Sequence, residues 1–149
     1  MQEALAVQVF ESLQVVALDT AVRPLMAAGI VPDLVVSIDP TPLNGRHLLD
    51  LPLRKRPWLV AETSLDPRAI AAFSGRLFAC RINRADPWAW LERIGVAPTK
   101  VRAWGSVLTT ACDLVTHMKP ARVAFAAVDL AYTDGQTYCR GTAFEDDWA

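Results

Sequence analysis

Short runs of Val, Ile, Leu and Ala alternate along this chain with segments in which apolar residues recur every three or four positions. Continuous apolar runs without polar alternation are typical of strands that are buried on both faces of a sheet. The pattern therefore predicts strands at residues 13–19, 32–39, 57–62, 76–82 and 122–128.

The amphipathic segments between these runs predict helices. The most regular one begins at Ser106, a favourable N-cap, and ends at Met118, with its apolar positions on one face at helical spacing. Another helix is expected at residues 20–28, with Pro24 in its first turn and Gly29 just beyond its end, where a left-handed residue costs least. Further helical patterns lie at residues 2–10, 66–73 and 87–94.

Strict alternation of strand and helix implies parallel strands that are joined by right-handed crossovers. The predicted fold class is therefore α/β, a layered sandwich around a mostly parallel sheet. At 149 residues the chain suits a single domain over residues 1–149, with no linker, repeat or low-complexity tract.

Composition excludes several classes of protein. The chain has 52% apolar and 21% charged residues, as a globular protein does. No apolar run approaches the roughly 20 residues that a membrane span needs. The net charge of −1 and the lack of a long basic block give no sign of the basic surface that binds nucleic acid. The first residues include Glu3 and no basic stretch, so we expect no signal peptide and a cytoplasmic location. Three widely spaced cysteines favour neither a disulfide framework nor a zinc site.

An acidic residue ends four of the predicted strands: Asp19, Asp39, Glu62 and Asp129. The carboxyl ends of parallel strands lie along one edge of a sheet, where open α/β sheets bind ligands. Converging carboxylates repel one another unless Mg²⁺ with its phosphates, or the hydroxyls of a ribose or sugar, compensates them. A ligand site at this edge is one interpretation. The other is that each acid caps the next helix or starts a turn, as Asp does routinely.

The stretch SIDPTPLNGRHLLDL gathers several polar groups after the second predicted strand. Asp39 is followed by two prolines and then by Asn44, Arg46 and His47. An amide, a guanidinium and an imidazole above a carboxylate suit a phosphorylated or polyhydroxylated ligand. Taken alone, His47 fits a helix-start or core histidine equally well. His117, near the end of a helix, fits a favourable C-terminal charge.

Two stretches carry a family resemblance: LDTAVRPLMAAGIVPDLVVSIDPTPLNGRHLLDL and GSVLTTACDLVTHMKPARVAFAAVDLAYTDGQTYCRGT. They resemble the 6-hydroxymethylpterin diphosphokinase-like family, which includes the motility accessory factors of flagellated bacteria, over roughly residues 15–141. The resemblance implies a three-layer Rossmann-like sandwich and chemistry on activated phosphate compounds. An archaeal branch transfers a diphosphate from ATP to a pterin alcohol with Mg²⁺. A bacterial branch is linked to glycosylation of flagellin with nucleotide-activated nonulosonic acids. The NGRH pattern and the tyrosines Tyr132 and Tyr138 look closer to the bacterial branch.

Two features depart from the family pattern. Members usually begin with a strand and a GxGPSL-like turn that offers backbone N–H groups to phosphate. Here residues 1–12, which precede the first predicted strand, contain no glycine, so the chain resembles a partial or truncated family core. Before Asp129 stand Ala127 and Val128, where the family usually has glycine and a polar residue.

Three functions of different class remain open. The first is a nucleotide-dependent transferase of the glycosylation type, acting on an activated sugar and a protein acceptor. Its candidate catalytic residues are Asp39, His47 and Asp129, and its candidate substrate contacts are Asp19, Asn44, Arg46, Tyr132 and Tyr138. The second is an ATP-dependent diphosphokinase in which Asp39 and Asp129 hold Mg²⁺. The third is a non-enzymatic remnant or interaction module, favoured by the missing glycine-rich turn.

Overall fold

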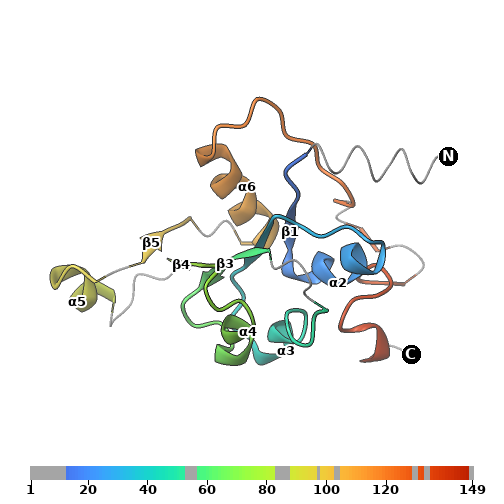
Figure 1. The fold of residues 1–149 in the computed structure, drawn as a ribbon, viewed down its shortest axis with the longest axis horizontal. Coiled ribbons are helices and arrows are strands. Elements are labelled where there is room, and N and C mark those ends of the chain that lie inside the picture. The colour runs from blue at the N-terminus through green and yellow to red at the C-terminus, as the bar shows by residue number, and fades with distance from the viewer. Residues whose placement is uncertain are drawn as a thin grey trace.

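A computed structural model of the chain describes residues 13–52, 57–82, 88–96, 98–102, 105–128, 131–132 and 135–147. Along these residues the strands of a parallel sheet alternate with helices (Figure 1). The strands are β1 (Val16–Leu18), β2 (Leu34–Ser37), β3 (Trp58–Glu62), β4 (Leu77–Arg81) and β5 (Thr99–Lys100). The helices are α2 (Asp19–Ala27), α3 (Pro42–Gly45), α4 (Pro67–Ala72), α5 (Trp88–Arg93), α6 (Val107–His117) and the 3₁₀ helix η1 (Glu145–Asp147). The helix predicted at residues 2–10 lies outside the described residues.

The strands follow one another across the sheet in chain order, and every neighbouring pair is parallel. Val16 pairs with Leu34, which in turn pairs with Trp58. This arrangement confirms the predicted α/β class. Because each crossover moves in the same direction along the sheet, the right-handed rule places α2, α3 and α4 on one face. Because β1, β2 and β3 are parallel neighbours, their carboxyl ends lie side by side.

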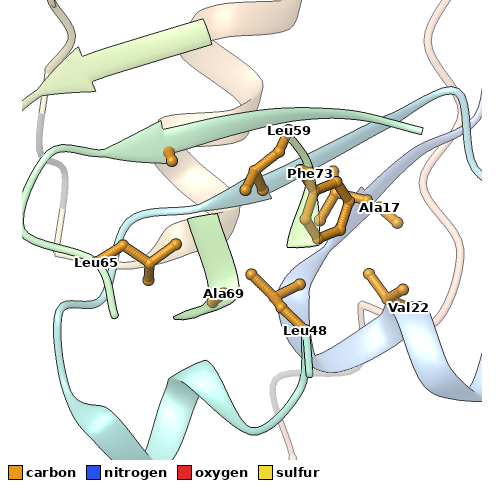
Figure 2. Packing of buried hydrophobic residues seen from close by; sticks show 9 residues of the cluster. Ala17, Val22, Leu48, Leu59, Leu65, Ala69 and Phe73 are labelled. Carbon is orange, nitrogen blue, oxygen red and sulfur yellow. The ribbon is translucent and has the colours of Figure 1, made fainter. Parts of the chain in front are cut away.

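Each face of the sheet has its own apolar core. On one face a cluster of buried apolar side chains comes from the sheet, from α2 and α4 and from the segments beside α3 and α4 (Figure 2). The cluster contains Ala17, Val22, Val35, Leu48, Leu59, Ala61, Leu65, Ala69 and Phe73. On the other face Ala111 of α6 packs with Val36, Val60 and Cys80. Burying each large apolar side chain contributes about 1.5–3 kcal/mol, so the two cores hold the helices against the sheet.

The helix boundaries confirm most of the amphipathic pattern. Ser106 caps α6, since its Oγ accepts a hydrogen bond from the backbone N–H of Thr109 at 3.2 Å. Gly29 follows α2 with a φ of 78°, as predicted for the left-handed position. The predicted position of Pro24 was wrong: α2 begins at Asp19, so the proline lies inside the helix and not in its first turn. A proline there leaves one helical hydrogen bond unmade. None of the described helices is long and apolar enough to cross a membrane.

The strand predicted at residues 122–128 is wrong. All seven residues are exposed and without regular secondary structure, and Phe125 is 63% exposed. Ala127 has a φ of 54°, which is outside the range of a strand. A strand forms only where a neighbouring strand takes up its backbone N–H and C=O groups, and no described strand pairs with this run. The apolar sequence could not show that this neighbour is missing from the described sheet.

Candidate functional site

A buried polar network joins the carboxyl ends of β1 and β2. Asp19 Oδ2 accepts hydrogen bonds from Ser37 Oγ at 2.8 Å and from Asn44 Nδ2 at 2.6 Å. Its Oδ1 accepts a third, at 2.8 Å, from the backbone N–H of Thr20. The exposed fractions of Asp19, Ser37 and Asn44 are 1%, 0% and 7%. A carboxylate this deep is stable only among donors, and these three groups supply them.

The local sequence explains how these side chains meet. β1 ends at Leu18 and α2 begins at the next residue, so Asp19 lies in the first helical turn, where a negative charge is favourable. Ser37 is the last residue of the adjacent strand. Pro42 stands in the first turn of α3, where a missing N–H costs nothing, and the short helix then brings Asn44 back to the strand ends.

Gly45 lets α3 lie close to the start of α4. A Cβ at this position would stand 3.0 Å from Cβ of Asp66, closer than side chains normally approach. Asp66 is the N-cap of α4 and accepts a hydrogen bond from the backbone N–H of Arg68 at 2.8 Å. Side-chain hydrogen bonds from the Arg68 guanidinium lower the pKa of Asp66 below its ordinary value. The close approach of α3, which carries Asn44, to the start of α4 thus depends on a glycine at position 45.

His47 follows α3 and is completely buried. In the described part of the chain, neither of its ring nitrogens has a hydrogen-bond partner. Its ring meets that of Phe144 edge-on, with the centroids 4.5 Å apart. The pKa of His47 is lowered from its ordinary value, and burial of the ring is the largest cause. The negative charge of Asp19 opposes this shift, whereas the guanidinium groups of Arg23 and Arg46 reinforce it. His47 is therefore a neutral imidazole at neutral pH.

Arg23 of α2 holds the segment that contains His47. Its Nη2 donates to the backbone carbonyl of Arg46 at 3.0 Å and also to that of Leu49. Its Nε donates to the carbonyl of Arg46 at 3.3 Å. One side chain thus bridges both ends of the turn after α3 and fixes the position of the imidazole between them.

The C-terminal strap, residues 138–147, lies over this turn and is drawn in red at the end of the ribbon in Figure 1. Arg46 Nη1 donates to Asp147 Oδ2 at 2.7 Å. The Arg46 guanidinium carbon lies 5.8 Å from the ring centroid of Phe144. The strap therefore covers His47 with an aromatic ring and pairs Arg46 with a carboxylate.

Two of the acids predicted at strand ends form local turns. Asp39 is half-buried, and its Oδ1 accepts a hydrogen bond from the backbone N–H of Thr41 at 2.9 Å. Glu62 Oε2 accepts one from the backbone N–H of Ser64 at 2.6 Å. These contacts are those of turn-forming acids. The carboxyl ends of β1, β2 and β3 therefore share an edge, as predicted, but Asp39 and Glu62 bond to groups close to them in sequence, unlike Asp19.

The remaining predicted residues are distributed unevenly. Asn44, Arg46 and His47 lie together around α3, and Asn44 joins Asp19 directly. Tyr132 is 76% exposed. Tyr138 belongs to the strap and lies against Phe144, with ring centroids 5.8 Å apart. Asp129 lies outside the described residues.

The site offers a hydroxyl, an amide, a carboxylate, an imidazole and a guanidinium within one region. These groups can bind sugar hydroxyls and phosphate oxygens. Among the described residues, no three His, Cys, Asp or Glu side chains gather closely enough to hold a metal ion. Of the pair expected to hold Mg²⁺, Asp39 offers a carboxylate at the carboxyl edge of the sheet and Asp129 is not described.

Sequence reasoning missed three residues that shape the site: Ser37, Arg23 and Phe144. A serine at the end of a buried strand is a signal that could have pointed to Ser37. No local signal pointed to Phe144, because the strap meets α3 from the far end of the chain. The ion pair between Arg46 and Asp147, for example, spans 101 positions.

Comparison with known proteins gives one family match and one relative. The sequence model of the family described as 6-hydroxymethylpterin diphosphokinase MptE-like matches residues 4–135. A protein of Treponema pallidum (strain Nichols), described as uncharacterized, is 25% identical over 134 residues, which cover 82% of this chain and 34% of that protein. The chain thus spans about a third of the length of this relative. No solved structure matches the chain with significance.

Proposed function

Because the chain belongs to the 6-hydroxymethylpterin diphosphokinase MptE-like family, we propose that it is the core of a nucleotide-dependent transferase domain. Its donor is a nucleotide-activated sugar and its acceptor a protein such as flagellin, as for the motility accessory factors. The observation that carries this proposal is the buried Asp19 network beside His47 at the carboxyl ends of two parallel strands.

The chemistry of the network supports a ligand rich in hydroxyls. Asn44 and Ser37 each combine donor and acceptor groups, and both already bond to a carboxylate. A sugar or ribose hydroxyl can exchange with such groups without a net loss of hydrogen bonds. In the proposed site Arg46 pairs with the phosphate, and His47 and Asp39 are the groups that could move a proton. Asp129, Tyr132 and Tyr138 complete the proposed set.

A second candidate function is an ATP-dependent diphosphokinase, and the description of the matched family favours it. In that reaction Mg²⁺ held by Asp39 and Asp129 would neutralise the phosphates of ATP. Asp39 fits the oxygen preference of the ion. The residues of this chain would position ATP and the acceptor alcohol, and Arg46 would bind a phosphate oxygen.

The free cysteines support a reducing compartment for either reaction. Cys80 is buried, Cys112 half-buried and Cys139 exposed, and all three are unpaired thiols. A cytoplasmic location is therefore part of the proposal.

Thermal stability in the presence of ligands distinguishes these functions. A CMP-linked sugar should raise the melting temperature without added metal if the chain is a sugar transferase core, whereas ATP should do so only with Mg²⁺ if it is a diphosphokinase. Asp39→Asn should abolish the Mg²⁺-dependent effect. Asp113→Asn on α6, across the sheet, is the matched control with the same loss of charge and should leave it unchanged. Stabilisation by neither ligand would contradict both reactions and favour a non-enzymatic interaction module.

A further inference from the structure

The C-terminal strap presents two groups to the turn after α3, an aromatic ring and a carboxylate. Phe144 meets the imidazole of His47 at 4.5 Å and faces the guanidinium of Arg46 at 5.8 Å. Asp147 Oδ2 lies 2.7 Å from Nη1 of the same guanidinium. Arg46 and His47 thus already bind, within the chain itself, a planar ring and an anion that are three residues apart.

The strap is held by contacts that a ligand can replace. The side chains of Arg46 and Asp147 are 39% and 46% exposed, and an ion pair that solvent reaches contributes little to stability. Two polar groups, one in the turn and one in the strap, have no hydrogen-bond partner among the described residues although they are buried: the imidazole of His47 and the hydroxyl of Thr142. Unpaired buried groups make the packing of the strap over the turn less stable, and a ligand with donors and acceptors can form hydrogen bonds with them.

From this geometry we propose that Arg46 and His47 form a subsite for a planar ring linked to an anion, and that Phe144 and Asp147 occupy this subsite until the ligand displaces them. A nucleotide is the ligand class with both groups. Its phosphate replaces the Asp147 carboxylate on Arg46, and its base replaces the Phe144 ring. This inference rests on the proposed function and names the element of the chain that regulates access to its site.

The strap acts in this arrangement as an internal competitor. The apparent affinity for the nucleotide equals the intrinsic affinity multiplied by the fraction of molecules whose strap is displaced. Weakening the strap therefore raises the apparent affinity without any change in the residues that hold the ligand. A strap that merely packs against the domain predicts no such gain.

Binding of CMP, measured by isothermal titration calorimetry, tests the proposal. Phe144→Ala combined with Asp147→Asn should bind CMP about tenfold more tightly than the wild type, because one aromatic contact and one ion pair of the closed state are lost. Asp147→Asn alone should give a gain of roughly two- to fivefold. Glu145→Gln is the matched control, since it removes the same charge from the strap and can keep the contact that Glu145 makes with the backbone N–H of Gly141. It should bind CMP as the wild type does.

The two parts of the ligand are tested separately. Cytidine offers the ring alone and inorganic phosphate the anion alone, so each should bind more weakly than CMP. A second readout needs no nucleotide: diethyl pyrocarbonate should modify His47 several-fold faster in the two strap variants, with the exposed His117 of the same molecule as the internal reference.

The outcomes separate this inference from the proposed function. If the wild type binds CMP and no strap variant binds it more tightly, the strap does not compete and the inference is wrong, while the proposed function stands. If no form binds CMP, ATP or a CMP-linked sugar, both fail. Asp147→Asn changes only an exposed pair, so the comparison holds even if the Phe144→Ala variant does not fold.

Discussion

Asp19 should stabilise the folded state, and replacing it should show how much its buried hydrogen bonds contribute to the free energy of unfolding. Replacing it by alanine leaves the donors of Ser37 and Asn44 buried without their acceptor. Each such group costs about 1–3 kcal/mol. Ser37 Oγ and Asn44 Nδ2 are 3.5 Å apart and can partly satisfy each other, and removing a buried carboxylate also removes the cost of burying it. We therefore expect Asp19→Ala to lower the free energy of unfolding by about 2–4 kcal/mol.

Asp19→Asn separates the charge of this carboxylate from its shape. The amide oxygen can still accept from the backbone N–H of Thr20, and the amide nitrogen can donate to Ser37 Oγ and to a rotated Asn44. The expected loss is only about 1 kcal/mol, since every polar group keeps a partner.

Urea denaturation followed by circular dichroism measures these changes, and a double-mutant cycle with Ser37→Ala isolates the contact. Ser37→Ala should cost about 1 kcal/mol, and its effect should largely disappear in the Asp19→Ala background because the hydroxyl has then lost its acceptor. A loss below about 1 kcal/mol for Asp19→Ala, or strict additivity of the two changes, would refute the buried network.

Three further predictions concern other parts of the fold. The pKa of His47 is lowered from its ordinary 6.5, so the unfolded chain binds the proton first as the pH falls. The free energy of unfolding, measured in urea titrations, should therefore decrease as the pH is lowered from about 7.5 to about 5.5. His47→Gln should flatten this dependence on pH. Ser106→Ala should lower stability by about 1 kcal/mol in the same titrations because the backbone N–H of Thr109 loses its cap; an unchanged midpoint would contradict the cap. Burial, with a contribution from nearby Glu62, raises the pKa of the Cys80 thiol to about 11. Iodoacetamide at about pH 8 should therefore label the exposed Cys139 far faster than Cys80. Equal labelling rates, measured by mass spectrometry, would contradict the buried position of Cys80.

The parallel sheet was readable from the sequence because its physical cause is local. A strand that is buried on both faces needs continuous apolar residues, and β2 and β3, which are mostly buried, show them with boundaries close to those predicted. β4 also lies where the apolar run predicted it, although Phe78 is 54% exposed. The cap of α6 and the left-handed Gly29 were likewise readable, since a hydroxyl and a missing Cβ act within a few residues of their position. The family resemblance was confirmed for the same reason, since motifs are local in sequence.

The parts that the sequence did not determine depend on contacts between distant residues. Residues 122–128 have the composition of a strand, and only the sheet itself shows that no described strand pairs with them. The carboxylates at the strand ends look alike in sequence, yet Asp19 enters a buried network because Ser37 of β2 and Asn44 of α3 donate to it. Asp39 and Glu62 instead accept hydrogen bonds from backbone N–H groups two residues further along the chain. The cover on His47 comes from Phe144 near the other end of the chain. Apolar periodicity records which residues avoid water, but the identity of the residue that shields another is decided only when the tertiary structure brings the two together.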